Sequence, residues 1–240
     1  MERKTKIKIK YKLKELFYHF RLDLFVPHKI FLLLSHMSEV SKWISTKGKS
    51  DYNDFYLKKR DYAKRYKLYE YVIDKEEIKS NIDYLEFGVA SGNSFKWWLE
   101  KITDENSRFY GFDTFTGLPE KWGPFNVGDM NPGKEIPKYN DSRYVLINGL
   151  FQKTLYDFLE KYDPSKKKII HMDADLYSST NFVLHALTPV IKSGDIILFD
   201  EFNVPMHEFK AFSEWTQINY IDYEVIGSVN NFLQVAIKIK

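Results

Sequence analysis

The stretch Tyr84-Leu-Glu-Phe-Gly-Val-Ala-Ser-Gly-Asn-Ser94 joins an apolar segment, Ile82–Phe87, to a helical pattern over residues 93–102. It contains two glycines at a spacing of four, Gly88 and Gly92. Glycines let a backbone approach a bound group closely, and the free N–H groups at a helix N-terminus attract a carboxylate or a phosphate. The stretch therefore predicts a turn between a strand and a helix that is either ligand-binding or purely structural.

Apolar segments and helical patterns alternate beyond this turn. The apolar segments are short and end in acids or glycines. Such alternation is typical of an α/β fold with a mostly parallel sheet that helices cover on both faces. The expected strands are residues 82–87, 109–112, 144–147, 168–172 and 196–199, and the expected helices are residues 61–80, 93–102, 152–161, 178–191 and 207–219.

The C-terminal residues follow a different pattern. Residues 222–227 and 232–239 are expected to be strands, and residues 228–231 between them are typical of a hairpin turn. The last strand must therefore run opposite to its neighbour.

The N-terminal residues are expected to form a helical appendage and linker over 1–60, followed by one domain over 61–240. Residues 1–20 carry seven basic and two acidic side chains, a net charge of +5, whereas the rest of the chain carries −2. Apolar residues alternate with the lysines and continue into a helical pattern over 29–45. This apolar stripe is expected to pack on the body or on a second subunit of a homodimer, with a weak membrane-surface contact through residues 1–45 as the alternative.

Composition narrows the class of protein. The 240 residues include no cysteine, which excludes disulfides and thiolate metal sites. No apolar run approaches the roughly 20 residues that cross a bilayer, and no signal-peptide pattern is present, so we expect a cytoplasmic protein. The near-neutral body argues against a nucleic-acid partner.

One connection, residues 114–143, is unusually long and rich in glycine and proline. Loops of this length in a compact domain are usually functional, so it is expected to be a lid. Its side chains Trp122, Phe125 and Met130 either stack on a ligand or pack the lid on the body.

Acidic side chains follow several expected strands. Asp113 comes 25 residues after Gly88, where an acid can accept hydrogen bonds from a ribose diol of a nicotinamide or an adenosyl cofactor. The spacing Gly-x-Gly-x-x-Gly of a dinucleotide fingerprint is absent, because position 90 is Ala and position 93 is Asn. The turn and Asp113 together thus indicate a cofactor site without choosing the cofactor.

A second set of acids lies at the ends of two later strands, at Asp173, Asp175, Asp200 and Glu201. The carboxyl ends of parallel strands meet at one edge of a sheet, so Asp173, Asp200 and Glu201 are expected in one cleft. Three carboxylates there would repel one another unless a hard cation, Mg²⁺ or Ca²⁺, bound them. The alternative is that Asp173, Asp175 and Asp200 cap the helices that follow. His171 is expected in the core or behind the site.

Five segments in this order resemble a known family: LEFGVASGNS, GFDTFTGLPE, VLINGLFQKTL, HMDADLYSST and SGDIILFDEF. The chain is similar over about residues 80–205 to the class I S-adenosylmethionine-dependent methyltransferases, and among them to the macrocin O-methyltransferase family. The resemblance implies a Rossmann-like sheet of seven strands with the last antiparallel. It also implies Mg²⁺-assisted methylation of a sugar hydroxyl.

Site residues are carried over from the resemblance by position. Asp173, Asp200 and Glu201 would bind Mg²⁺, with Asp173 also the general base, and relatives commonly have Asp-Asp where this chain has Asp200-Glu201. The acceptor would be a nucleotide sugar, a glycan or a glycosylated metabolite. The alternatives are a nicotinamide-dependent oxidoreductase and a non-catalytic interaction protein on the same fold. The expected S-adenosylmethionine site comprises Glu86, Gly88, Ser91, Gly92, Ser94, Asp113, Thr114, Asn148, Gly149, Phe151 and Asp173.

Overall fold

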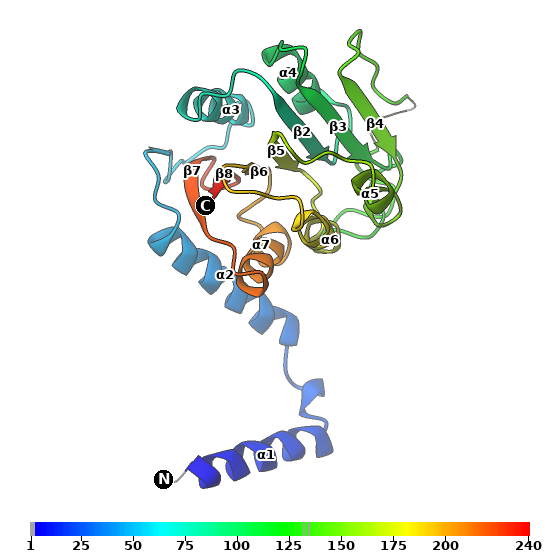
Figure 1. Ribbon diagram of the computed structural model, residues 1–240. Helices are drawn as coiled ribbons and strands as arrows, with labels where there is room; N and C mark the ends of the chain where they lie inside the picture. The colour runs from blue at the N-terminus through cyan, green and yellow to red at the C-terminus, as the bar shows by residue number, and fades with distance from the viewer. Residues whose placement is uncertain (1–2, 132, 134) are drawn as a thin grey trace.

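Helices cover both faces of a central sheet in the computed structural model (Figure 1), which describes residues 3–131, 133 and 135–240. Residues 1–2, 132 and 134, which fall in the expected appendage and the expected lid, lie outside the described residues. The helices are α1 (Arg3–His19), α2 (His28–Thr46), α3 (Lys64–Lys75), α4 (Asn93–Lys101), α5 (Phe151–Leu159), α6 (Tyr177–Leu187) and α7 (Glu208–Ile218), with a 3₁₀ turn η1 (Leu22–Leu24). The strands are β1 (Tyr52–Asn53), β2 (Ile82–Phe87), β3 (Arg108–Asp113), β4 (Tyr144–Asn148), β5 (Lys167–Met172), β6 (Ile196–Phe199), β7 (Tyr223–Val229) and β8 (Gln234–Ile239).

The sheet has the order β1-β7-β8-β6-β5-β2-β3-β4. Strand β8 pairs antiparallel with both β6 and β7, and the other pairs are parallel. The antiparallel last strand and the terminal hairpin are therefore confirmed. The expected count of seven strands is wrong by one, because Tyr52–Asn53 of the expected linker pairs with β7 as an eighth, edge strand.

Two apolar layers explain why helices cover both faces. Residues on alternate positions of the strands point to opposite faces. One face packs against α3 and α4, and the other packs against α5, α6, α7 and the C-terminal half of α2. From β2 the chain adds β3 and β4 in one direction along the sheet, and from β5, the other neighbour of β2, it adds β6 in the opposite direction. Ligands of open α/β sheets bind at such a reversal of strand order.

Helix α3 is shorter than the expected 61–80. Glu77, just beyond the helix, has φ 51°, and Asn81 has φ 53°. These left-handed residues end the helix and turn the chain into β2. The other expected helices are present with ends shifted by a few residues.

The N-terminal segment divides into two parts. Val40 and Trp43 of α2 are buried against the body, and the Trp43 indole N–H donates to the hydroxyl of Tyr223 at 2.7 Å. Helix α1 has no buried residue among those described and extends away from the body (Figure 1). The end of α2 thus packs on the body as expected, whereas no described residue of α1 is buried there, and packing of α1 on a second subunit stays a prediction. The domain boundary at residue 60 stays a prediction, although residues 40–53 contribute to the body.

Candidate active site

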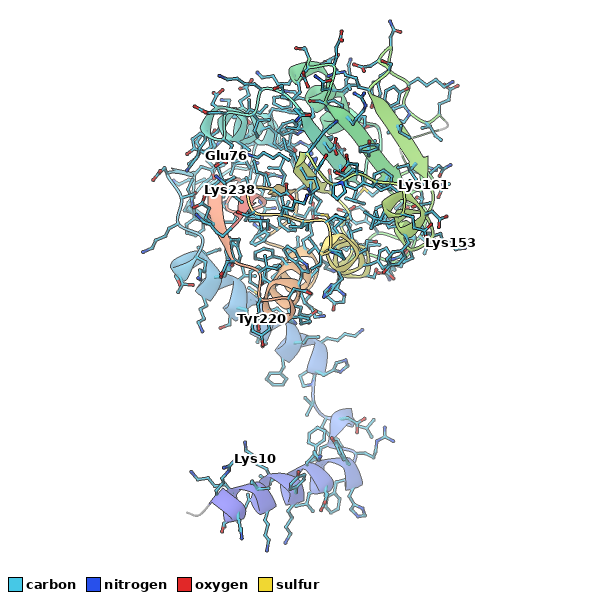
Figure 2. All side chains as sticks on the ribbon, viewed as in Figure 1. Lys10, Glu76, Lys153, Lys161, Tyr220 and Lys238 are labelled. Atoms are coloured by element: carbon cyan, nitrogen blue, oxygen red, sulfur yellow. The ribbon has the colours of Figure 1, made fainter. Side chains whose placement is uncertain are left out.

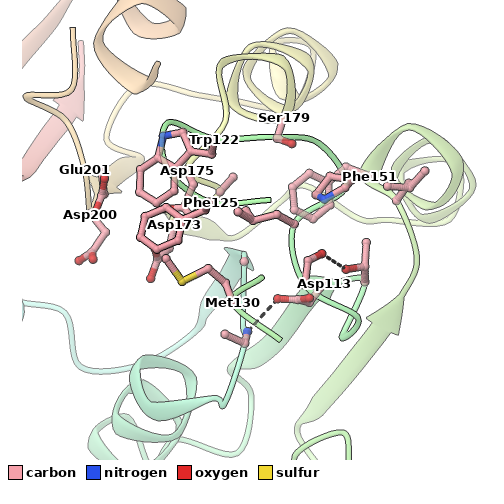
Figure 3. A pocket seen from close by; sticks show the side chains of 18 of the residues that line it. Asp113, Trp122, Phe125, Met130, Phe151, Asp173, Asp175, Ser179, Asp200 and Glu201 are labelled. Atoms are coloured by element: carbon pink, nitrogen blue, oxygen red, sulfur yellow. Dashed lines mark hydrogen bonds between the residues drawn. The ribbon is translucent and has the colours of Figure 1, made fainter. Parts of the chain in front are cut away.

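A pocket of about 430 Å³ lies at the carboxyl ends of the strands, next to the neighbouring strands β2 and β5. Figure 3 shows Trp122, Phe125 and Met130 of the long loop beside it, with Asp113 and Phe151 toward one end and Asp200 and Glu201 toward the other. Seven of the expected site residues line it: Gly88, Asp113, Thr114, Phe151, Asp173, Asp200 and Glu201.

The glycine turn is shaped by contacts within the protein. Gly88 has φ +101°, and a Cβ there would lie 1.7 Å from the backbone oxygen of Asp173. Only glycine therefore fits where β2 ends beside β5. Gly92 has φ +77°, and a Cβ would lie 2.0 Å from the hydroxyl of Tyr139 in the long loop. The two glycines bring the β2–α4 turn against Asp173 on one side and against the loop on the other.

Asp113 connects this turn to the start of the long loop. Its Oδ2 accepts from the backbone N–H of Ala90 at 2.8 Å, and its Oδ1 accepts from that of Phe115 at 2.6 Å. The carboxylate holds both segments in place while it lines the pocket. A ribose diol at this position would share these oxygens with the backbone donors.

The other expected cofactor residues lie outside the described lining of the pocket, namely Glu86, Ser91, Gly92, Ser94, Asn148 and Gly149. Glu86 is buried and accepts from the hydroxyl of Tyr84. That hydroxyl also lies 2.8 Å from Nδ1 of His171, whose Nε2 lies 3.2 Å from the hydroxyl of Tyr69. Because the proton of Tyr84 goes to Glu86, Nδ1–H of His171 donates to Tyr84, while Nε2 lies within hydrogen-bond distance of the hydroxyl of Tyr69. His171 is thus a core residue behind the site, as expected.

The second set of acids meets around an arginine. One ligand atom each of His171, Asp173 and Asp200 lies within 4.8 Å of the others. The guanidinium of Arg65, from α3, lies 3.2 Å from Oδ2 of Asp200 and 4.0 Å from Oδ2 of Asp173. Oδ1 of Asp200 is buried without a hydrogen-bond partner among the described residues. Glu201 lies beside this group and accepts from the hydroxyl of Tyr62 at 3.3 Å.

Burial and mutual repulsion change the protonation of these acids. Burial, then the neighbouring charges of Asp200 and Asp175, raises the pKa of Asp173 well above its ordinary value. Burial and the charge of Glu201 raise the pKa of Asp175 to about 7. Burial also raises the pKa of Glu208, whose carboxylate accepts from the backbone N–H of Glu201 at 3.0 Å. Burial and mutual repulsion therefore disfavour the ionised forms of these acids.

The donor set fits a hard cation in part. Asp173 and Asp200 converge, and the unpartnered Oδ1 of Asp200 is the kind of oxygen that Mg²⁺ binds. Both ring nitrogens of His171 are engaged by tyrosines, so this histidine is not a free ligand. Helix capping does not explain the acids, because α6 and α7 follow Leu176 and His207 and have no side-chain cap.

The long loop lines the pocket and contacts the body through aromatic side chains, while its role as a lid stays a prediction. Trp122 stacks on Phe125 with ring centroids 5.2 Å apart and meets His207 edge-on at 6.2 Å. At the far end of the loop, Tyr139 stacks on Phe95 of α4 and donates to the backbone oxygen of Gly92 at 3.0 Å. The loop is therefore anchored on both sides of the pocket, as a lid would be.

Comparison with known proteins assigns the domain. The sequence pattern of a family described as "Methyltransferase domain" matches residues 85–202. Residues 85–202 form a methyltransferase domain. No curated protein matches the chain.

Solved structures support the class I fold of this methyltransferase domain. A crystal structure of CalS11, described as a calicheamicin methyltransferase, is 19% identical with a TM-score of 0.57, covering 89% of this chain and 93% of that one. An apo structure of CalS11, described as TDP-rhamnose 3'-O-methyltransferase of calicheamicin biosynthesis, is 17% identical with a TM-score of 0.51, covering 89% and 95%. The O-methyltransferase NovP is 16% identical with a TM-score of 0.53, covering 88% and 98%.

Sequence reasoning missed the contribution of α3 and of the turn before it to the site. Arg65 and Tyr62 line the pocket of the methyltransferase domain and reach its acids. A signal was present, because Arg65 shares a helix face with Tyr62, Tyr69 and Val72 at spacings of three, four and seven. A cation within a stripe of core side chains indicates an acidic partner.

Proposed function

We propose that this chain transfers a methyl group from S-adenosylmethionine to a sugar hydroxyl with the help of Mg²⁺. The observation that carries the proposal is one pocket with the turn-holding acid Asp113 at one end and the converging acids Asp173 and Asp200 at the other. The match of residues 85–202 supports methyl transfer and counts against a nicotinamide-dependent oxidoreductase. The names of CalS11 and NovP support a sugar and an oxygen acceptor.

The donor would occupy the end of the pocket that Asp113 and Phe151 line. Bound S-adenosylmethionine would supply an electrophilic methyl group on its sulfonium. Asp113 and Thr114 would hold the ribose, and Phe151 would pack near the adenine with Asn148 and Gly149 behind it. The turn from Gly88 to Ser94 would face the methionine portion, with Ser91 at its surface, Gly92 buried under Tyr139, and Glu86 and Ser94 beneath the turn.

The acceptor hydroxyl would lie at the acidic end, next to Asp173. Asp173 would take the hydroxyl proton as general base, in its ionised form, which a bound cation would favour by offsetting the burial and the neighbouring charges that raise its pKa. Asp200 would hold Mg²⁺ with Asp173, and Glu201 would join them if its longer side chain leaves Tyr62. The bound ion would lower the pKa of the hydroxyl and orient it. Trp122, Phe125 and Met130 would cover the sugar and exclude water.

The test is calorimetric titration of S-adenosylmethionine and its demethylated product into the protein, first without and then with Mg²⁺. Binding of both, followed by a mass gain of one methyl group on a thymidine diphosphate sugar, would support the proposal. If neither ligand binds, both without and with Mg²⁺, the proposal is refuted. NADH titrated in parallel provides the control for the oxidoreductase. The homodimer stays a prediction, to be checked by the mass of the chain in solution.

A further inference from the structure

Exposed apolar side chains are concentrated in the N-terminal segment. Of the 26 large apolar side chains that are exposed among the described residues, 16 lie between Ile7 and Met37. Phe25 is 80% exposed and Leu24 is 71% exposed. Figure 2 shows the side chains of α1, including Lys10, projecting away from the helix with the body at a distance. The body therefore leaves this segment uncovered.

Helix α1 carries two apolar stripes separated by two rows of lysine. Ile9, Leu13 and Leu16 lie on one face, and Ile7, Tyr11 and Tyr18 lie on the other. The same helical spacing places one lysine row on each border between them, formed by Lys4, Lys8 and Lys12 and by Lys6, Lys10 and Lys14. Whichever stripe is buried, a lysine row therefore flanks it on each side.

The start of α2 is apolar on all sides over residues 30–34. Five consecutive residues at the start of α2, Ile30–Leu34, are each between 41% and 60% exposed. Consecutive positions of a helix point in every direction, so one flat protein surface cannot cover all five. A helix that is apolar all round needs apolar surroundings.

Two partners could cover these apolar side chains, a second copy of the chain or a lipid surface, and the charge of the segment favours the lipid surface. Residues 3–29 include nine basic and two acidic side chains, a net charge of +7 without histidines. A second copy packed stripe against stripe would place the lysine rows of the two chains beside each other, and like charges at this spacing repel. An anionic lipid surface has the opposite charge, and lysine side chains can reach the head groups while the apolar stripe enters the acyl boundary.

We propose that residues 3–34 dock this enzyme on an anionic membrane surface. Helix α1 lies in the interface with one apolar stripe buried, and the start of α2 enters the same layer. No described helix is long and apolar enough to span a bilayer, so the contact is interfacial. The end of α2, whose Trp43 is packed in the body, connects the body to the membrane-bound segment.

The experiment is cosedimentation of the full chain with vesicles of phosphatidylcholine containing 30% phosphatidylglycerol, compared with vesicles of phosphatidylcholine alone. The chain should partition into the anionic vesicles, and binding should weaken with salt. The triple variant Lys6→Gln, Lys10→Gln, Lys14→Gln should lose on the order of 100-fold of the partition coefficient, from about 1 kcal/mol per basic residue. The matched control removes three exposed lysines from the body, Lys153, Lys161 and Lys192, and should bind as the parent does.

Two outcomes would overturn the proposal. One is a partition that does not depend on charge, seen as equal partition of the parent and the triple variant or as equal partition into anionic and neutral vesicles. The other is a stable dimer in vesicle-free solution that Leu13→Asn dissociates, which would assign the stripe to a second copy. Because α1 has no buried residue, these substitutions should leave the unfolding temperature of the body unchanged. The test involves no catalysis, so it is independent of the proposed activity.

Discussion

Arg65 lies 3.2 Å from Asp200 and places a fixed positive charge among the acids at the carboxyl ends of β5 and β6. Its side chain is 19% exposed and that of Asp200 is 4% exposed. The pair is therefore largely removed from water, where the loss of one partner leaves an uncompensated charge. Arg65 stabilises the acid cluster without an ion, and a bound cation would share this task.

Replacement of Arg65 tests this balance. Arg65→Gln should lower the free energy of unfolding by roughly 3 kcal/mol in chelator, because Asp200 loses its buried partner. Mg²⁺ should then raise the unfolding temperature of the variant more than that of the parent. Arg65→Lys keeps the charge and serves as the control. Equal stability of the parent and Arg65→Gln in chelator would contradict the conclusion that Arg65 stabilises the acid cluster.

Asp173 is the proposed base. Asp173→Asn should reduce turnover on a thymidine diphosphate sugar by at least about 100-fold, the usual contribution of general base catalysis. Binding of S-adenosylmethionine, measured by calorimetry, should be largely retained. Asp83→Asn, at the opposite ends of the strands, is the matched control and should keep its turnover. A near-normal rate in Asp173→Asn would remove this residue from the chemistry.

Asp113 has a structural and a binding role that one pair of variants separates. Asp113→Ala frees the backbone N–H groups of Ala90 and Phe115, so it should lower both the unfolding temperature and the affinity for S-adenosylmethionine, the latter by at least about tenfold. Asp113→Asn keeps one acceptor oxygen and should be intermediate in both. If the affinity is unchanged while the unfolding temperature falls, Asp113 serves the turn alone.

The lid prediction concerns Trp122. Trp122→Ala removes the ring that stacks on Phe125 and meets His207. If the lid covers the acceptor, KM for the sugar should rise several-fold while the affinity for S-adenosylmethionine changes little. Tyr220→Ala, at a side chain that is 92% exposed on the body, is the control for loss of an aromatic ring. An unchanged KM would mean that these rings only pack the lid.

His207 predicts a pH dependence of stability. Burial lowers the pKa of His207 below its ordinary 6.5, and the charge of Glu120 opposes this in part. Below about pH 6.5 the unfolded chain binds a proton that the folded chain does not, so stability should fall as the pH decreases toward the folded pKa. The urea midpoints of parent and His207→Asn at pH 7.5 and 5.5 measure this. The variant should lose less between the two, and an identical decrease would exclude His207 as a cause.

The fold was largely predictable, because it depends on patterns that repeat along the chain. The short apolar segments that end in acids or glycines, the helical spacing between them and the hairpin near Asn230 each predict a local element that the structure confirms. The strand β1 escaped prediction, because two residues carry no period and Tyr52 pairs only once β7 is in place. Long-range pairing of this kind has no local signal.

The site was predictable where the residues end strands and less so elsewhere. Asp113, Asp173 and Asp200 meet in the pocket because parallel strands share an edge. Glu201 follows Asp200 directly, yet its side chain is held by Tyr62, a partner 139 residues away. Nor does the spacing of the glycines show what they contact, since Gly88 faces the backbone of Asp173 and Gly92 faces Tyr139.

The contact between Gly88 and the backbone of Asp173 has a consequence for how the acceptor specificity of such an enzyme can change. The turn that we propose faces the donor and Asp173, the proposed base, are set against each other by main-chain atoms, with the backbone N–H of Asp173 donating to the backbone oxygen of Phe87 at 3.0 Å. Side chains of the lid and of α3 can therefore vary without moving the two reacting ends apart. On the proposed assignment, exchange of the lining side chains would admit new acceptors, while the main-chain contact would keep the distance of methyl transfer the same.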